Sequence, residues 1–262
     1  MRIRRADAAL VGASFVGAAV FLWPFFGGHP GAAEAAAFGI GTAAALAAVE
    51  LAAGRLDTRQ LALLAALAAL DAAARAVVVT GIGGFSPIFL LILCGGYVFG
   101  AGYGFLLGAT TILVSALVTG GIGPWLPYQL FAAGWVGALA GAAAHGRRGR
   151  PTRRDVVVLA CVGVLLGYGY GVVMDIWDWT YFAASPGLGF RPGMPFLTIL
   201  QHFGRFYLVT SLAYDTFRAV GNAVMVAVLG LPVLIALARL RTRLHANVDR
   251  TVPVMPPDRH AA

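Results

Sequence analysis

Long apolar stretches alternate with short polar ones along almost the whole chain. Eight apolar stretches can be drawn, at 8–26, 33–53, 60–80, 86–99, 101–119, 126–144, 156–176 and 214–238. Most are close to the length of about 20 residues that an α-helix needs to cross a bilayer. Transmembrane β-strands would give shorter segments of alternating hydrophobicity. The pattern therefore predicts an all-α integral membrane protein with about eight helices.

Composition supports an integral membrane protein and argues against a soluble domain or a nucleic-acid-binding protein. The chain is 60% hydrophobic and only 11% charged, which is not typical of a soluble domain. Its net charge of +8 comes from arginine, which is enriched in the cytoplasmic loops of membrane proteins, so we do not interpret it as nucleic-acid binding. Cys94 and Cys161 both lie in apolar stretches, so neither a disulfide framework nor a metal site is expected.

The arginines are distributed unevenly about the apolar stretches. If the N-terminus is inside, most of the 19 lie in inner segments, and the outer loops hold only Arg191 and Arg205. Basic residues favour the cytoplasmic side, so both termini are expected in the cytoplasm. The outer loops are then 27–32, 81–85, 120–125 and 177–213.

One short segment, Gly120–Gly141, combines a turn with a close-packing helix. The turn is rich in glycine and proline and is followed by Trp125, Tyr128 and Gln129. The helix after it carries small residues at four-residue spacing: Ala133, Gly137 and Gly141. Such spacing lets helices approach closely, so we expect this helix to pack within the bundle. The stretch 86–99 is short and contains glycine, so it is expected to be tilted, broken or buried.

Polar residues gather where the last two apolar stretches reach the outer side. These residues are Asp175, Asp215, Arg218 and Asn222, with Trp177 and Trp179 beside the first of them. Charges in membrane segments are costly and often mark functional sites. We expect these residues to converge at the outer mouth of the bundle and, with Trp125, Tyr128 and Gln129, to bind a ligand. The alternative is an interfacial polar belt with tryptophan anchors.

The outer segment 177–213 is long for a compact bundle, which favours a lid or a binding loop over a structural cap. Its last part, 196–213, mixes polar and apolar residues and is expected to form an amphipathic helix at the interface. In the third apolar stretch, Asp71 and Arg75 are one turn apart and are predicted to form an ion pair. A role of the two residues in gating or partner contact is the alternative.

No catalytic set is recognisable in the sequence. The five histidines are scattered, and there is no phosphate-binding loop, nucleophile elbow or cysteine pair. No metal, cofactor or catalytic residue is therefore predicted, and an enzyme is disfavoured.

From about Leu61 to Leu240 the chain resembles the substrate-binding S components of energy-coupling factor (ECF) vitamin transporters. The motifs that carry this resemblance are the Gly-Pro-Trp-x-Pro-x-Gln turn at Gly123–Gln129 and the Tyr-Asp-x-x-x-Ala-x-Gly-Asn entry at Tyr214–Asn222. The Ala-rich helix from Leu61, the short segment Ser86–Gly100 and the Trp/Asp-rich exit at Asp175–Trp179 add to it.

The resemblance implies a six-helix bundle, here with two extra N-terminal helices. The expected division is an accessory hairpin at 1–56, the core at 57–244 and a disordered cytoplasmic tail at 245–262. S components associate with a membrane coupling subunit and two cytoplasmic ATPases. The face implied to contact the coupling subunit consists of small residues of the first core helix: Ala62, Ala65, Ala66, Ala69 and Ala73.

The ligand is implied to be a vitamin captured from outside. Cobalamin is the leading candidate, with riboflavin, pantothenate, folate or another small precursor as alternatives. The chain lacks an N-terminal Met-x-His start, which argues against the nickel and cobalt branch of the family. Two other functions remain as alternatives: an intramembrane enzyme using Asp175 and Asp215, and a structural membrane protein without a transported ligand.

Overall fold

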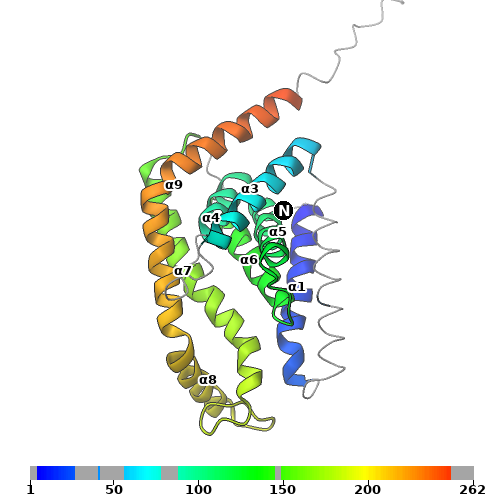
Figure 1. The fold of residues 1–262 in the computed structure, drawn as a ribbon, viewed down its shortest axis with the longest axis vertical. Helices are drawn as coiled ribbons and strands as arrows, with labels where there is room; N and C mark the ends of the chain where they lie inside the picture. The colour runs from blue at the N-terminus through cyan, green and yellow to red at the C-terminus, as the bar shows by residue number, and fades with distance from the viewer. Residues whose placement is uncertain (1–4, 27–40, 42–55, 78–87, 145–148, 249–262) are drawn as a thin grey trace, which may run out of the picture.

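The computed structural model describes residues 5–26, 41, 56–77, 88–144 and 149–248. These residues form a bundle of α-helices, and no strand occurs among them (Figure 1). In chain order the elements are α1 (Arg5–Phe26), α3 (Thr58–Val77), α4 (Ile88–Phe99), α5 (Ala101–Thr119), α6 (Leu126–Ala143), α7 (Arg153–Asp178), the 3₁₀ helix η2 (Trp179–Phe182), α8 (Phe196–Thr210) and α9 (Leu212–Val248). Apart from residue 41, the predicted stretch 33–53 lies outside the described residues.

Among the described residues, three helical runs are long and apolar enough to cross a membrane: Ala101–Thr119, Arg153–Phe182 and Leu212–Leu244. Shorter apolar helices run over Leu10–Phe25 and Ile88–Phe99. The all-α membrane class predicted from the sequence is therefore confirmed. Asp57 precedes α3 and caps its N-terminus. Its carboxylate Oδ1 accepts a hydrogen bond from the Gln60 N–H at 2.8 Å.

Glycines bring α4, α5 and α6 into close contact at the centre of the bundle. Gly96 of α4, Gly104 of α5 and Gly137 of α6 meet so closely that a Cβ on any one would overlap the backbone of another. Ala133 and Gly141 lie against α5 and its N-terminal end in the same way. The predicted packing role of the four-spaced small residues is confirmed, and α4 is buried along almost its whole length.

The second close helix pair is α7 with α9, which run side by side (Figure 1). Gly163, Gly167 and Gly171 follow one another at four-residue spacing on the face of α7 that meets α9. A Cβ at Gly167 would lie 2.9 Å from the Cα of Ala219. The last helix is longer than predicted, because α9 continues through Val248 instead of ending near 238. The first residues of the predicted disordered tail are thus helical, and 249–262 lies outside the described residues.

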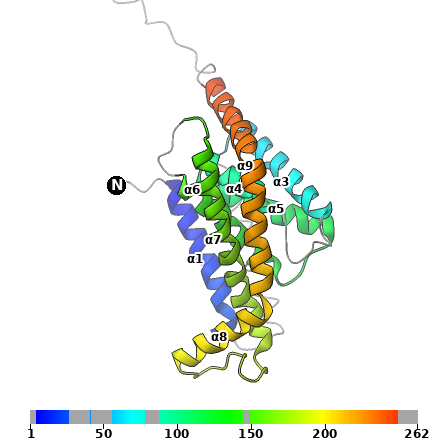
Figure 2. The same cartoon turned by 90° about the vertical axis from the view of Figure 1, so that its left-hand side faces the viewer.

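The helix α8 lies at one end of the molecule, across the start of α9 (Figure 2). We call this the α8 end; it also holds η2 and the turns that connect η2 to α8. The sequence prediction of a helix at 196–213 is confirmed over Phe196–Thr210. At the opposite end, Tyr97 OH donates a hydrogen bond to Asp155 Oδ1 at 2.8 Å, and Arg241 Nη1 donates to the Val98 carbonyl at 2.6 Å. These contacts tie α4, α7 and α9 together.

The first helix, α1, packs against α6 and α7 rather than standing apart. Trp135 Nε1 of α6 donates a hydrogen bond to Ser14 Oγ at 3.0 Å. Phe21 is buried, with its ring centroid 5.0 Å from that of Tyr128 and 5.6 Å from that of Trp135. Aromatic contacts therefore join α1 to the same helix that follows the Gly/Pro-rich turn.

The predicted ion pair between Asp71 and Arg75 is wrong. Asp71 is buried, with 1% of its surface exposed, and its Oδ2 has no hydrogen-bond partner. Leu67, Ala68 and Ala72 of the same helix are buried as well, whereas Arg75 is half-buried. Spacing of i and i+4 places two side chains on the same side of a helix, but it does not by itself bring their charged groups into contact.

Candidate functional site

A cavity of about 380 Å³ lies at the α8 end, between α7 and the junction of α8 with α9. Its lining combines three carboxylates, one guanidinium, two hydroxyl side chains and several apolar or aromatic ones. The lining residues are Gly171, Met174, Asp175, Asp178, Phe182, Phe206, Thr210, Ser211, Tyr214, Asp215 and Arg218. Three of the residues predicted from the sequence, Asp175, Asp215 and Arg218, are therefore brought together here.

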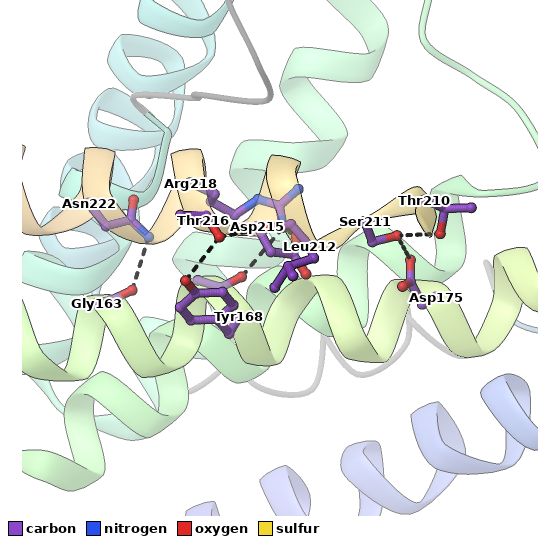
Figure 3. Close-up of polar contacts among 11 residues, drawn as sticks. Gly163, Tyr168, Asp175, Thr210, Ser211, Leu212, Asp215, Thr216, Arg218 and Asn222 are labelled. Carbon is purple, nitrogen blue, oxygen red and sulfur yellow. Dashed lines mark hydrogen bonds and ion pairs between the residues drawn. The ribbon is translucent and has the colours of Figure 1, made fainter. Parts of the chain in front are cut away.

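Asp175 reaches the cavity from the last turns of α7. Its Oδ1 accepts a hydrogen bond from Ser211 Oγ at 2.7 Å, and the Ser211 hydroxyl also contacts Thr210 Oγ1 at 3.0 Å (Figure 3). Ser211 lies in the short break between α8 and α9, so this bond fixes the junction onto α7. The second carboxylate oxygen, Oδ2, is buried and has no hydrogen-bond partner.

Asp215 and Arg218 face the cavity from the first turns of α9. They form an ion pair through Asp215 Oδ1 and Arg218 Nη1 (Figure 3). The guanidinium also donates to the Gly167 carbonyl at 3.4 Å and lies 5.0 Å from the centre of the Tyr170 ring. Arg218 is therefore engaged on several sides, while Asp215 Oδ2 is buried without a partner.

Asn222 was predicted to join this site, but it does not line the cavity. Its Nδ2 donates a hydrogen bond to the Gly163 carbonyl at 3.1 Å, further along the α7–α9 contact (Figure 3). Between the two positions, the Tyr168 and Thr216 hydroxyls lie 3.1 Å apart. Asn222 thus joins α7 to α9, and it holds the helices that carry the cavity residues.

The aromatic residues predicted for the site lie outside the cavity lining. Trp177 is buried and stacks on Tyr128, with ring centroids 5.2 Å apart. Trp179 is buried and donates from Nε1 to the Leu188 carbonyl at 2.6 Å, which fixes the turn after η2. Trp125 is 38% exposed and donates to the Gly121 carbonyl at 3.2 Å. Gln129 is half-buried on α6. Trp179 therefore supports the α8 end, and none of these four residues lines the cavity.

Several cavity residues were missed by reasoning from the sequence. Ser211 and Thr210 lay within a segment interpreted as an interfacial helix, and Phe206 lay within the same segment. Gly171 matters because the Asp215 carboxylate occupies the space that a Cβ there would take. The repeat Gly163, Gly167 and Gly171 at four-residue spacing was a signal that could have identified this helix contact.

The arrangement offers both polar and apolar contacts to a small molecule. Buried carboxylates, a guanidinium and hydroxyls offer directed polar contacts, and the aromatic and thioether side chains offer apolar ones, as in many small-molecule sites. In the part of the chain that the structure describes, no group of three or more His, Cys, Asp or Glu side chains could hold a metal ion.

The part of the chain that forms this site matches a known protein family. A family model described as the substrate-specific component of ECF transporters matches residues 59–230. The match runs from the start of α3 to the middle of α9 and so includes every residue that lines the cavity, while α1 lies before it. No curated protein and no solved structure matches the chain.

Proposed function

The chain belongs to the family of substrate-specific components of ECF transporters, and we propose that it binds a small vitamin or vitamin precursor in the cavity at the α8 end. The observation that carries this proposal is the cavity itself. Asp175 and Asp215 line it, although only 4% and 1% of their surfaces are exposed. Polar groups buried without full compensation are costly, and they are commonly retained where they meet a ligand.

The α8 end is proposed to face the outside of a bacterial cytoplasmic membrane, with both termini inside. The distribution of arginine supports this orientation, because basic residues favour the cytoplasmic side. In this orientation α8, η2 and the turns between them cover the cavity from outside. The exposed residues of α8 are mixed, because Phe196, Leu200 and Val209 are exposed alongside Gln201 and Arg205. Such a mixture of apolar and polar residues suits a helix at the membrane interface.

Cavity size supports a ligand smaller than cobalamin. Small-molecule sites commonly occupy about 300–1,000 Å³, and the cavity here, about 380 Å³, is near the lower end. A complete corrinoid with its nucleotide loop needs more space than this. Among the candidates considered from the sequence, the geometry therefore favours a compact vitamin or precursor over cobalamin.

Delivery inward is proposed to require a membrane coupling subunit and two cytoplasmic ATPases, as the family implies. The exposed face of α3 supports the proposed contact with the coupling subunit. Every small residue of that face is exposed: Ala62, Ala65, Ala66, Ala69 and Ala73. The opposite face of α3, with Leu64, Leu67 and Ala68, is buried in the bundle. A smooth exposed stripe allows another helix to approach closely.

The proposal is tested by ligand binding to the purified full chain in detergent. A panel of vitamins of different size and charge is added, and the thermal unfolding midpoint is recorded. A ligand that binds the folded chain at about 100 times its Kd adds about 2.7 kcal/mol of stability, which gives a readily measured shift. The proposal predicts such a shift for at least one vitamin and its loss in Asp175→Asn. A panel without any shift would contradict it.

A further inference from the structure

The cavity at the α8 end is richer in negative than in positive side chains. Asp175, Asp178 and Asp215 line it together with a single cation, Arg218. We infer that its ligand is an organic cation, such as a protonated amine or a positively charged ring nitrogen; this inference rests on the proposed binding function. The inference specifies the charge of the ligand, whereas family membership alone does not specify it.

The single guanidinium is already compensated. Arg218 pairs with Asp215, donates to the Gly167 carbonyl and stacks over the Tyr170 ring at 5.0 Å. Asp175, in contrast, receives a hydrogen bond only from the neutral hydroxyl of Ser211. Asp178 lies one turn further along α7 and is half-buried. The cavity wall formed by α7 therefore carries two carboxyl groups, Asp175 and Asp178, neither of which forms an ion pair with Arg218.

Two carboxylate oxygens are also left without a partner. Oδ2 of Asp175 and Oδ2 of Asp215 are both buried without a hydrogen-bond partner, although the Tyr207 hydroxyl lies near the Asp215 carboxylate. These side chains are 4% and 1% exposed. Asp215 has Arg218 as its ion-pair partner, whereas Asp175 has no cationic partner. A buried carboxylate without such a partner is unfavourable, and a ligand cation placed beside Asp175 would reduce that cost. An anionic ligand would add to it.

The remaining lining favours an organic cation over a bare metal ion. Phe182, Phe206 and Tyr214 offer ring faces, and Met174 offers a thioether. Aromatic faces attract cations, most strongly when the cation is poorly hydrated. Hard metal ions instead need several oxygen ligands gathered at one point. The carboxylates described here do not form such a group.

The first test needs no variant. The full chain in detergent is titrated at constant ionic strength with three probes of similar size: benzyltrimethylammonium, benzyl alcohol and benzoate. The expected result is a concentration-dependent rise of the unfolding midpoint with the cation, and none with the neutral or anionic probe. Stabilisation by benzoate or benzyl alcohol equal to that by benzyltrimethylammonium would overturn the inference. So would a response to Mg²⁺ or Ca²⁺ in place of the organic cation.

The second test uses neutral isosteres of the carboxylates. Asp175→Asn keeps an oxygen that can accept the Ser211 hydrogen bond, so it removes charge with little change of shape. Asp178→Asn removes charge at the more exposed position. Each is expected to raise the Kd for benzyltrimethylammonium by about tenfold or more. Asp57→Asn is the control, because Asp57 caps α3 away from the cavity and asparagine caps equally well.

The outcomes separate this inference from the proposed function. If a neutral or anionic vitamin from the panel binds tightly and the cations do not, the charge inference is wrong and the binding function stands. If no vitamin and no probe binds, the binding function fails and the charge inference fails with it. An unchanged Kd in both Asp175→Asn and Asp178→Asn, with the folded state retained, would also overturn the inference.

Discussion

The carboxylate of Asp215 lies directly against the backbone of Gly171, where α9 crosses α7. A Cβ at position 171 would overlap both carboxylate oxygens and the carbon between them. The glycine therefore sets how deeply Asp215 can enter the cavity wall and where its ion pair with Arg218 forms. Gly171, which has no side chain, therefore determines where the Asp215 carboxylate lies on the neighbouring helix.

Replacing this glycine should impair both the site and the fold. Gly171→Ala is expected to push Asp215 outward, to destabilise the chain by about 1–3 kcal/mol and to weaken ligand binding. The matched control is Gly169→Ala on the same helix, where a Cβ would meet no atom within 4 Å. Thermal unfolding in detergent and ligand titration measure the two effects. Equal behaviour of the two variants would show that the contact with Asp215 has no such role.

The centre of the bundle should be equally sensitive to a single methyl group. Gly137→Ala would bring a Cβ into the backbone of Gly104, so α5 and α6 must separate. We expect a loss of about 1–3 kcal/mol, or a failure to accumulate in the membrane. Gly102→Ala, on the exposed side of α5, is the control, and it should leave the unfolding midpoint unchanged or slightly higher because alanine favours helix.

The attachment of α1 to the core can be tested with two phenylalanines of the same helix. Phe21 is buried against Tyr128 and Trp135, whereas Phe15 is 73% exposed. Phe21→Ala is expected to destabilise the chain by about 1–3 kcal/mol, because packing contacts are lost that lipid replaces only in part. Phe15→Ala should have little effect. If both variants unfold like the unaltered chain, α1 is not a packed part of the bundle.

The exposed stripe on α3 predicts a separation of binding from transport. Ala69→Trp places a bulky ring in the middle of the face proposed to meet the coupling subunit. It should abolish co-purification with that subunit and uptake into cells, while ligand binding by the isolated chain stays unchanged. Ala227→Trp is the control, because Ala227 is exposed on α9, away from this stripe. Retained co-purification of Ala69→Trp would refute the proposed contact face.

Helix positions could be predicted from the sequence because they depend on local properties. Apolar stretches of sufficient length must satisfy their backbone hydrogen bonds internally within a bilayer, so each becomes a helix. The described helices agree with the predicted stretches, and the packing role of Gly137 and its four-spaced neighbours was also predicted correctly. The end of α9 was not, because its last turns are polar and continue beyond the apolar pattern.

The candidate site was only partly predictable. Asp175, Asp215 and Arg218 were identified because charge in an apolar segment is rare and costly. Trp177, Trp179 and Asn222 were assigned to the same site on proximity in the sequence, yet they pack against Tyr128, Leu188 and Gly163 instead. Sequence proximity indicates which end of a helix a residue occupies, but not which way its side chain turns.

The sequence by itself determined the class of the protein, the run of its helices and the end of the bundle where the polar residues lie. Only the tertiary structure decided that Asp71 is buried without an ion pair to Arg75, that Ser211 donates a hydrogen bond to Asp175, and that the Asp215 carboxylate packs against Gly171. The physical reason is that hydrophobicity and helix formation act along the chain, whereas these contacts depend on how closely two helices approach. That distance is set by the residues of both helices at once.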